Sequence, residues 1–283
     1  MGNALVCESC DGYRWYVREH PRFSHDGSTL QFREISTYRA LRDASSKDKV
    51  FVDIGSHVGY YTVRLAKYYK KVVAIEPNPY SIQALKENIR LNNLTNVEVI
   101  ECACGDVESE AVLYDRGAMA TLLPVVECWE RIKVKVKPLD DLVEKADVIK
   151  IDAEAYEEKI LLGAKRILSE CKPVIIIEHH DFRGYNIDSE PRIRNQILRD
   201  YWAIELNTIH CLYIPKGVDL SPFKQQIADV WIKRVLDNIQ KGLPWYYGLP
   251  HTWWWGFEPT DFFAELPNHV VKEKEWLEGA VKR

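Results

Sequence analysis

Short β-rich runs alternate with segments of helical periodicity between residues 49 and 178, and this alternation restricts the chain to few folds. Units of strand, helix and strand build a parallel sheet that is covered by helices on both faces. The expected fold class is therefore α/β, with a doubly wound and mostly parallel sheet. Its strands are predicted at 49–54, 72–76, 97–101, 148–152 and 173–178, and its helices at 60–69, after Pro79 and at 156–168.

The last strand of this series differs from the others because it has no polar alternation. Val174 to Ile177 form a continuous apolar run, which predicts a strand covered on both faces at the centre of the sheet. Beyond it, 202–206 and 211–214 are predicted as a closing pair of strands. Their link at Asn207-Thr208 is too short for a parallel crossover, so antiparallel pairing is expected.

Three segments depart from the rhythm of strand and helix. An irregular, charged stretch between the third and fourth strands is interpreted as an insertion near the site, with edge strands at 111–114 and 132–136. Ile193, Ile197 and Tyr201 indicate a helix before the closing strands. Apolar residues at helical spacing predict a further helix near the carboxyl end: Ile227, Trp231, Val235 and Ile239.

The chain is accordingly divided into an N-terminal extension over 1–45, a catalytic domain over 46–215 and a C-terminal extension over 216–283. The C-terminal extension is dense in aromatic residues between 244 and 267, including Trp253-Trp254-Trp255. Large aromatic side chains usually anchor a core or an interface. Burial or a homodimer contact is therefore expected there, rather than a stacking platform for an acceptor.

Composition narrows the partners and the compartment. The formal net charge of −4 and the pI near 6.1 argue against a protein that mainly grips nucleic-acid phosphates. No run approaches the ~20 apolar residues that cross a bilayer, and no secretion signal is recognised, so no membrane partner and a cytoplasmic location are expected. The seven scattered cysteines favour reduced thiols over a disulfide framework.

A glycine turn follows the first predicted strand at Asp53-Ile54-Gly55-Ser56-His57-Val58-Gly59. In an open α/β sheet, ligands lie beyond the carboxyl ends of the strands, and glycine there lets the backbone approach a ligand closely. A dinucleotide requires G-x-G-x-x-G, whose middle glycine is replaced here by His57. The sequence therefore disfavours phosphate binding and, with it, an oxidoreductase that uses a nicotinamide cofactor.

Two acids at consecutive strand ends favour a sulfonium nucleoside instead. S-adenosylmethionine carries no phosphate, but its amino-acid arm has an ammonium and a carboxylate, which suit Asp53 and the backbone N–H groups of the turn. Glu76 ends the second strand, where a carboxylate can accept hydrogen bonds from both ribose hydroxyls. S-adenosylmethionine is therefore the predicted cofactor.

Further motifs follow the glycine turn in a fixed order. They are Glu76-Pro77-Asn78-Pro79, Ala103-Cys104-Gly105-Asp106, and 149–154 (IKIDAE) with 172–178 (KPVIIIE). Together with 51–62 (FVDIGSHVGYYT), this set resembles the FkbM family of methyltransferases over residues 49 to 180. The first motif alone is typical of many class I methyltransferases, whereas the whole set is specific. One departure is Ala155. Family members usually have glycine after the D-x-E motif, which is Asp152-Ala153-Glu154 in this chain.

The resemblance implies a Rossmann-like class I methyltransferase fold, S-adenosylmethionine as donor, and O-methylation of a hydroxyl, often on a sugar or polyketide-like acceptor. It also implies that Asp106 or its neighbours contact the adenine. The residues predicted to bind the cofactor are Asp53, Gly55, Ser56, His57, Gly59, Glu76, Pro77, Asn78, Cys104, Asp106 and Asp152.

Transfer to a hydroxyl calls for a general base, and acids and histidines gather at the ends of the fourth and fifth strands. The candidate catalytic residues are Asp152, Glu154, Glu178, His179 and His180. His179 is the first choice for the base, with Asp152 as its orienter or as a ligand contact. Alternatively, Asp152 caps the following helix and His179 merely closes the strand. The cluster is also compatible with a divalent cation, but no spacing demands one, and no metal is assigned.

The leading functional hypothesis is O-methylation of a glycan or a small hydroxylated metabolite. An RNA methyltransferase acting on tRNA is the main alternative because such enzymes share a similar donor site, although the net acidity counts against it. A further alternative is a non-catalytic nucleoside-binding protein. Loss of the glycine at position 155 favours that alternative, whereas the intact acids Asp53, Glu76 and Glu178 disfavour it.

Overall fold

The computed structural model describes residues 4–18, 35–124, 127–180, 189–206 and 209–242. The chain divides into two compact units, 1–223 and 224–283. The second unit contains α7 (Lys224–Gln240), which confirms the helix predicted near the carboxyl end. The aromatic segment 244–267 and the link at Asn207-Thr208 lie outside the described residues. Within the described residues, no helix has both the length and the apolar character to span a membrane.

A seven-stranded sheet forms the centre of the first unit, in the order β11-β12-β10-β9-β3-β4-β5. Five of its strands run parallel, and they are β3 (Val50–Ile54), β4 (Lys71–Ile75), β5 (Val97–Ile100), β9 (Val148–Ile151) and β10 (Val174–Glu178). The closing pair, β11 (Tyr201–Glu205) and β12 (His210–Pro215), is antiparallel. The doubly wound, mostly parallel α/β sheet with an antiparallel closure is therefore confirmed.

The central strand of the sheet is β9 and not β10, so the prediction for Val174 to Ile177 is wrong by one strand. All four residues of β9 are buried, but Lys150 interrupts their apolar run. A charged residue in the middle of the sheet needs buried partners, which a hydropathy pattern does not reveal. The strand with the most apolar sequence therefore lies beside the centre.

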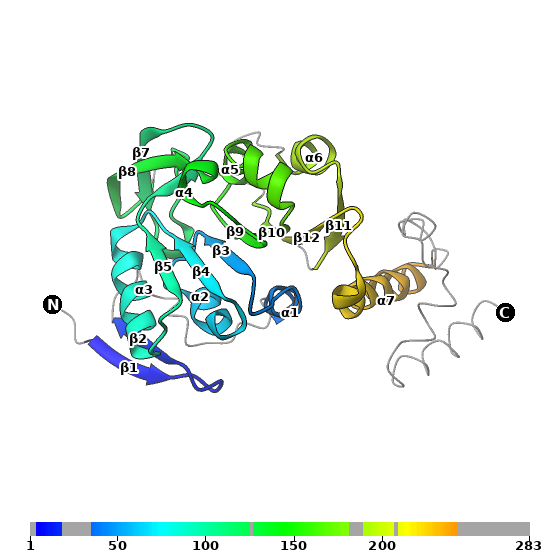
Figure 1. Ribbon diagram of the computed structural model, residues 1–283, viewed down its shortest axis with the longest axis horizontal. Coiled ribbons are helices and arrows are strands. Elements are labelled where there is room, and N and C mark those ends of the chain that lie inside the picture. The colour runs from blue at the N-terminus through cyan, green and yellow to red at the C-terminus, as the bar shows by residue number, and fades with distance from the viewer. Residues whose placement is uncertain (1–3, 19–34, 125–126, 181–188, 207–208, 243–283) are drawn as a thin grey trace. The chain divides into compact units, whose positions relative to one another are not determined.

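Helices cover both faces of the sheet (Figure 1). The helices α1 (Ile35–Asp43), α2 (Tyr60–Leu65) and α3 (Pro79–Leu91) lie on one side, and α4 (Leu139–Leu142), α5 (Glu157–Leu162) and α6 (Ser189–Arg192) lie on the other. The start of α3 follows from its sequence, because the side chain of Asn78 accepts a hydrogen bond from the backbone N–H of Tyr80 and Pro79 occupies the first turn.

Several shorter turns complete this unit. They are η3 (Ala66–Tyr68), η4 (Gly117–Met119), η5 (Ile167–Cys171), η6 (Ile193–Ile197) and η7 (Ser221–Phe223). The predicted helical stripe through Ile193, Ile197 and Tyr201 ends early, because Tyr201 begins β11 and pairs with Pro215. Sheet pairing thus overrides the helical spacing at this residue.

The insertion forms a second sheet of three strands, in the order β6-β8-β7. Its strands are β6 (Ala103–Gly105), β7 (Ser109–Asp115) and β8 (Glu130–Pro138). Both runs predicted as edge strands are strands of this sheet: 111–114 lies in β7 at its edge, whereas 132–136 lies in β8 in its middle. The two runs pair with each other because Leu113, Val134 and Val136 bury a small core of their own against Ala103.

The N-terminal strands β1 (Ala4–Glu8) and β2 (Arg14–Arg18) form an antiparallel hairpin that is fixed to α3. The backbone N–H of Tyr16 donates to Oδ1 of Asn88 at 2.7 Å, and that of Arg14 donates to Oδ1 of Asn92 at 2.9 Å. Trp15 between them is fully buried. The hairpin therefore belongs to the same compact unit as the sheet.

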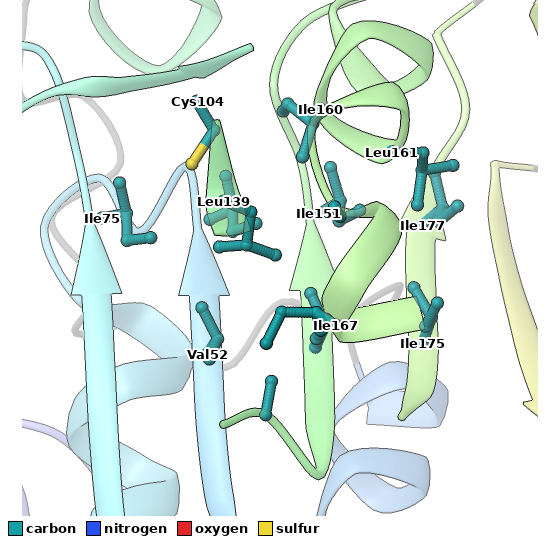
Figure 2. Packing of buried hydrophobic residues seen from close by; sticks show 14 of the residues in the cluster. Val52, Ile75, Cys104, Leu139, Ile151, Ile160, Leu161, Ile167, Ile175 and Ile177 are labelled. Atoms are coloured by element: carbon teal, nitrogen blue, oxygen red, sulfur yellow. The ribbon is translucent and has the colours of Figure 1, made fainter. Parts of the chain in front are cut away.

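A large hydrophobic core fixes the carboxyl ends of the central strands (Figure 2). Strand residues such as Val52, Ile75 and Ile151 pack against helical residues such as Ile160 and Ile167, all at most 2 % exposed. Close packing of this kind leaves little room for the strand ends to move. The side chains that follow these strands are therefore held by a rigid base.

Candidate active site

A cavity of about 430 Å³ lies at the carboxyl ends of β3, β4, β9 and β10, within the usual size range of small-molecule sites. Residues 116–120 and Leu122 of the insertion line it from the other side. The cavity lies at the edge of the sheet where an open α/β fold binds ligands.

The glycine turn forms one wall of the cavity and has little tolerance for side chains. Gly55 has φ +74°, and a Cβ built there would lie 1.8 Å from the carbonyl oxygen of Asp152. The N–H groups of Gly55 and Ser56 donate to the carbonyl of Ile75 at 3.0 and 3.2 Å. The turn therefore ties the ends of β3, β4 and β9 together, while Ser56 and His57 line the cavity.

Glu76 is the buried carboxylate of this wall and is 6 % exposed. Its Oε2 accepts a hydrogen bond from the N–H of His57 and its Oε1 from the N–H of Asn78, both at 2.8 Å. Burial raises the pKa of Glu76 to about 7. Because each carboxylate oxygen has more than one acceptor site, Glu76 retains capacity for donors from a ligand.

Asp53, by contrast, does not line the cavity, contrary to the geometry expected from its place at a strand end. It is 1 % exposed, and its Oδ2 accepts hydrogen bonds from the N–H and the hydroxyl of Thr62 at 3.1 and 2.6 Å. Burial raises the pKa of Asp53, against the opposing field of Lys150. The carboxylate fixes α2 behind the glycine turn, where we expected a contact with the ligand.

The other residues of the predicted cofactor set fall into two groups. Pro77, Cys104 and Asp152 line the cavity with Gly55, Ser56, His57 and Glu76. Gly59, Asn78 and Asp106 do not line it. The side-chain amide of Asn78 donates to Asp115 at 3.0 Å, and Asp106 forms an ion pair with Lys159 at 2.7 Å. These two side chains support the loops around the cavity.

Acids and one histidine converge at the other end of the cavity. Nε2 of His180 lies 3.3 Å from Oε1 of Glu178, 3.5 Å from Oε2 of Glu154 and 3.9 Å from Oδ1 of Asp152. All four side chains line the cavity. The predicted convergence of acids and a histidine at the ends of β9 and β10 is therefore present, with His180 as the histidine.

Three buried residues hold this cluster, and one of them, Lys150, also lines the cavity. Nζ of Lys150 lies 2.8 Å from Oδ2 of Asp152, and Nε2 of His210 lies 3.1 Å from Oε2 of Glu178. Glu157 contacts Nδ1 of His180 at 3.3 Å through Oε1, which also accepts hydrogen bonds from the N–H groups of 153 and 155. Asp152, Glu178 and His180 thus each have one polar atom held by a buried partner.

The electrostatics of the cluster follow from burial and from these contacts. Burial disfavours the charged ring of His180, but the contacts with Glu157 and Glu178 and the fields of Glu154 and Asp152 raise its pKa to about 11. Burial raises the pKa of Glu154 to about 8. Although burial opposes ionisation of Glu178, contacts with His180 and His210 hold its pKa well below the ordinary range.

His179 lies outside the lining of the cavity. Its Nε2 lies 2.9 Å from the hydroxyl of Tyr213, and the two rings meet edge to face with centroids 6.0 Å apart. Burial lowers the pKa of His179 to about 4. Successive side chains of an extended segment point to opposite faces, so Glu178 and His180 share the cavity while His179 faces away.

The D-x-E segment adopts an unusual backbone conformation. Glu154 and Ala155 have φ of 49° and 73°, in the left-handed region that glycine adopts most readily. The hydroxyl of Thr121 donates to the carbonyl of Glu154 at 2.8 Å, which helps to hold the segment. The alanine at the usual glycine position thus retains a conformation suited to glycine.

Sequence reasoning missed Lys150, Glu157 and His210. A period-two argument identifies Lys150, because it lies two residues before Asp152 and shares its face of β9. Glu157 and His210 reach the site through a helix start and an antiparallel strand, and no motif indicates either residue.

A mostly parallel α/β sheet, with a cavity that joins a glycine turn to a buried carboxylate on the next strand, defines a Rossmann-like class I methyltransferase. A family model described as "Methyltransferase FkbM domain" matches residues 53–202. The chain belongs to the FkbM methyltransferase family, as the resemblance of its motifs predicted.

Several known proteins are similar to parts of the chain. An uncharacterized protein of Methanocaldococcus jannaschii is 31 % identical over 187 residues, which cover 59 % of this chain and 70 % of that protein. Hexuronic acid methyltransferase AglP of Haloferax volcanii is 27 % identical over 154 residues, which cover 52 % of this chain and 62 % of that protein. The crystal structure of methyltransferase FkbM from Methylobacillus flagellatus has 23 % identity and a TM-score of 0.46, covering 69 % of this chain and 48 % of that one.

Proposed function

We propose that the protein is an S-adenosylmethionine-dependent O-methyltransferase that acts on a hydroxyl of a glycan or of a small hydroxylated metabolite. One observation carries the proposal: a single cavity joins the buried carboxylate of Glu76 to the cluster of Asp152, Glu154, Glu178 and His180. A donor site and a proton-handling site thus lie in one cavity, as methyl transfer to a hydroxyl requires.

The residues at the Glu76 end fit the chemistry of this cofactor. A nucleoside needs an acceptor for its ribose hydroxyls, which Glu76 offers, and an apolar slot for its base, which Ile75, Cys104 and Leu113 provide among the lining residues. The bound cofactor supplies a methyl group that its sulfonium already activates.

The cluster at the other end is suited to the acceptor. Orientation of two reacting groups can contribute roughly 7–11 kcal/mol to lowering a barrier, and a positioned base adds about 10²–10⁴-fold. Held by Lys150, Glu157 and His210, the cluster side chains orient a hydroxyl and receive its proton. We therefore place the acceptor beside His180 and Glu154, and assign His179 a supporting place against Tyr213.

The volume of the cavity, the name of one relative and the net charge support the proposed acceptor class. A cavity of about 430 Å³ accommodates a nucleoside and part of a small acceptor. One relative is named for a hexuronic acid, which is a sugar derivative. The net charge of −4 disfavours tRNA, although another relative, 46 % identical over 80 residues, is named as a tRNA(Phe) aminocarboxypropyltransferase.

Calorimetric titration tests the donor site. We expect S-adenosylhomocysteine to bind and NAD not to bind. Glu76→Gln removes a charged acceptor, and hydrogen bonds to charged groups contribute about 1.5–3 kcal/mol. The affinity of this variant for S-adenosylhomocysteine should therefore fall by about 10–100-fold. Glu98→Gln is the matched control, since it makes the same change in the ion pair with Lys71, outside the cavity. Tight binding of NAD alone would overturn the proposal.

Transfer of a labelled methyl group tests the acceptor. The protein is incubated with labelled S-adenosylmethionine and, separately, with glycan, small-metabolite and tRNA fractions. We expect label in the glycan or metabolite fraction, in a product with the stability of an ether. Label confined to tRNA would replace the proposed acceptor class while leaving the donor site intact.

A further inference from the structure

We propose that Asp152, Glu178 and His180 form a binding site for a divalent metal ion at the acceptor end of the cavity. The inference rests on the proposed function for its catalytic meaning, but its evidence is the arrangement of these three side chains. One ligand atom from each residue lies within 4.8 Å of the other two, and Nε2 of His180 faces both Oε1 of Glu178 and Oδ1 of Asp152. Two oxygens and one imidazole nitrogen are a common donor set for divalent ions.

The spacing of these atoms suits an ion between them better than direct pairing. Nε2 of His180 is 3.3 and 3.9 Å from the facing oxygens of Glu178 and Asp152, whereas a direct charge-assisted hydrogen bond measures about 2.7–2.9 Å. Protein ligands bind Mg²⁺ or Zn²⁺ at about 2.0–2.2 Å, so two ligands of one ion lie roughly 3 Å apart. The three atoms need to move little to share an ion.

The atoms behind the converging set supply independent support. Oδ2 of Asp152 is held by Lys150, Oε2 of Glu178 by His210, and Nδ1 of His180 by Glu157, whose side chains are 3 %, 0 % and 1 % exposed. Protein metal sites orient their ligands in this way, with a carboxylate on the far nitrogen of a ligating histidine and with partners on the ligating carboxylates. Each of the three residues therefore has one atom held by a buried partner, and a second atom in the converging set.

The surroundings fit an ion that takes part in binding the acceptor. The triad lines the cavity, so coordination positions remain open toward a ligand, and Glu154 adds a further oxygen 3.5 Å from Nε2 of His180. A divalent ion with open positions binds a hydroxyl oxygen and makes its proton more acidic. Such an ion would recognise a hydroxyl, especially one beside a second oxygen, as sugars and hydroxy acids present it.

Binding of Mn²⁺ tests the site directly, without requiring turnover. Free Mn²⁺ has a strong room-temperature electron paramagnetic resonance signal that is lost on binding, so a titration of the full chain counts bound ions. We expect one Mn²⁺ per chain, and at least tenfold weaker binding in Glu178→Gln and in His180→Ala. Glu98→Gln, which removes the carboxylate of the Lys71 ion pair outside the cavity, should bind Mn²⁺ like the wild type.

Two controls keep the outcome interpretable. Thermal unfolding and S-adenosylhomocysteine binding are measured for each variant, so that misfolding and failure of the donor site are recognised separately. Weak cation sites in proteins have dissociation constants up to about 1 mM. If the wild type binds S-adenosylhomocysteine but no Mn²⁺ up to that concentration, the metal site is refuted and the proposed function stands. Equal Mn²⁺ affinity in the wild type and both triad variants refutes it as well.

Discussion

The two ends of the cavity are polar for different physical reasons. At the Glu76 end, one buried carboxylate is stabilised by backbone N–H groups from the glycine turn and from the start of α3. At the His180 end, carboxylates and a histidine from β9, β10 and the segment before α5 are held by the charged or titratable side chains of Lys150, Glu157 and His210. Backbone N–H groups therefore stabilise the Glu76 end, and charged or titratable side chains stabilise the His180 end.

This difference determines how each end responds to change. Backbone donors persist under most substitutions, so the Glu76 end should fail mainly where the path of the chain itself is disturbed. Buried charges compensate one another, and removal of one partner leaves the other uncompensated. Substitutions at the His180 end should therefore be strongly non-additive, whereas those at the Glu76 end should be local.

The largest effect is expected where the two ends touch. In Gly55→Ala the new Cβ meets the carbonyl of Asp152 at 1.8 Å and the residue must keep φ +74°, so the free energy of unfolding should fall by roughly 4 kcal/mol or more. Gly217→Ala is the control, because φ is +88° but no atom lies within 4 Å of its Cβ. It should lose about 1–2 kcal/mol. Urea unfolding measures both, and equal losses would show that the close approach is unimportant.

The next largest effect is a pH dependence at the Glu76 end. The pKa of Glu76 in the folded protein, about 7, lies above the ordinary value of 4.5. Between these two values the native state holds a proton that the unfolded chain has already released. The corresponding contribution to stability is complete below pH 4.5 and is lost as the pH rises through 7. At 1.36 kcal/mol per pH unit, the loss is about 3 kcal/mol.

Urea unfolding of the ligand-free protein at pH 5 and pH 8 checks this sign. Relative to Glu76→Gln, which cannot titrate, the free energy of unfolding of the wild type should fall from pH 5 to pH 8. The fall should be most of the total of about 3 kcal/mol, because only a minor part is already lost at pH 5. Parallel behaviour of the two proteins would mean that the carboxylate is ionised in the folded state throughout.

How far the sequence predicts each end depends on how local its contacts are. Glu76 lines the cavity, and its place there follows from its position at a strand end and from the motif that it begins. His179, the first choice for the base, and His180 both follow β10, but only His180 lines the cavity. Counting two residues from Glu178 along an extended segment would have selected His180.

Asp53 and Asp106 illustrate what the sequence could not provide. Both occupy motif positions, yet Asp53 turns to Thr62 and Asp106 to Lys159, a partner 53 residues away. A motif locates a residue near the site but does not say whether its side chain contacts the ligand or the protein. That distinction depends on long-range contacts, as it does for Glu157 and His210.

A smaller effect tests the supporting role of Asp53. Thr62→Val removes a buried hydroxyl that donates to Oδ2 of Asp53 at 2.6 Å and keeps the shape of the side chain. A buried acceptor that loses a donor costs about 1–3 kcal/mol. We expect that loss in urea unfolding, with affinity for S-adenosylhomocysteine unchanged. Thr62→Ser, which keeps the hydroxyl, should lose less, and a collapse of affinity in Thr62→Val would instead place Asp53 at the ligand.

The smallest effect concerns the backbone at the His180 end. Ala155 has φ 73°, which is unfavourable for alanine by about 1–2 kcal/mol, so Ala155→Gly relieves strain while it loses a buried methyl and adds chain entropy to the unfolded state. These terms nearly cancel, and the free energy of unfolding should change by no more than ~0.5 kcal/mol. Ala153→Gly, two residues earlier and without positive φ, should lose about 1 kcal/mol. Equal losses in both variants would show that the left-handed conformation at Ala155 is not strained, and that the side-chain charges alone shape this end of the cavity.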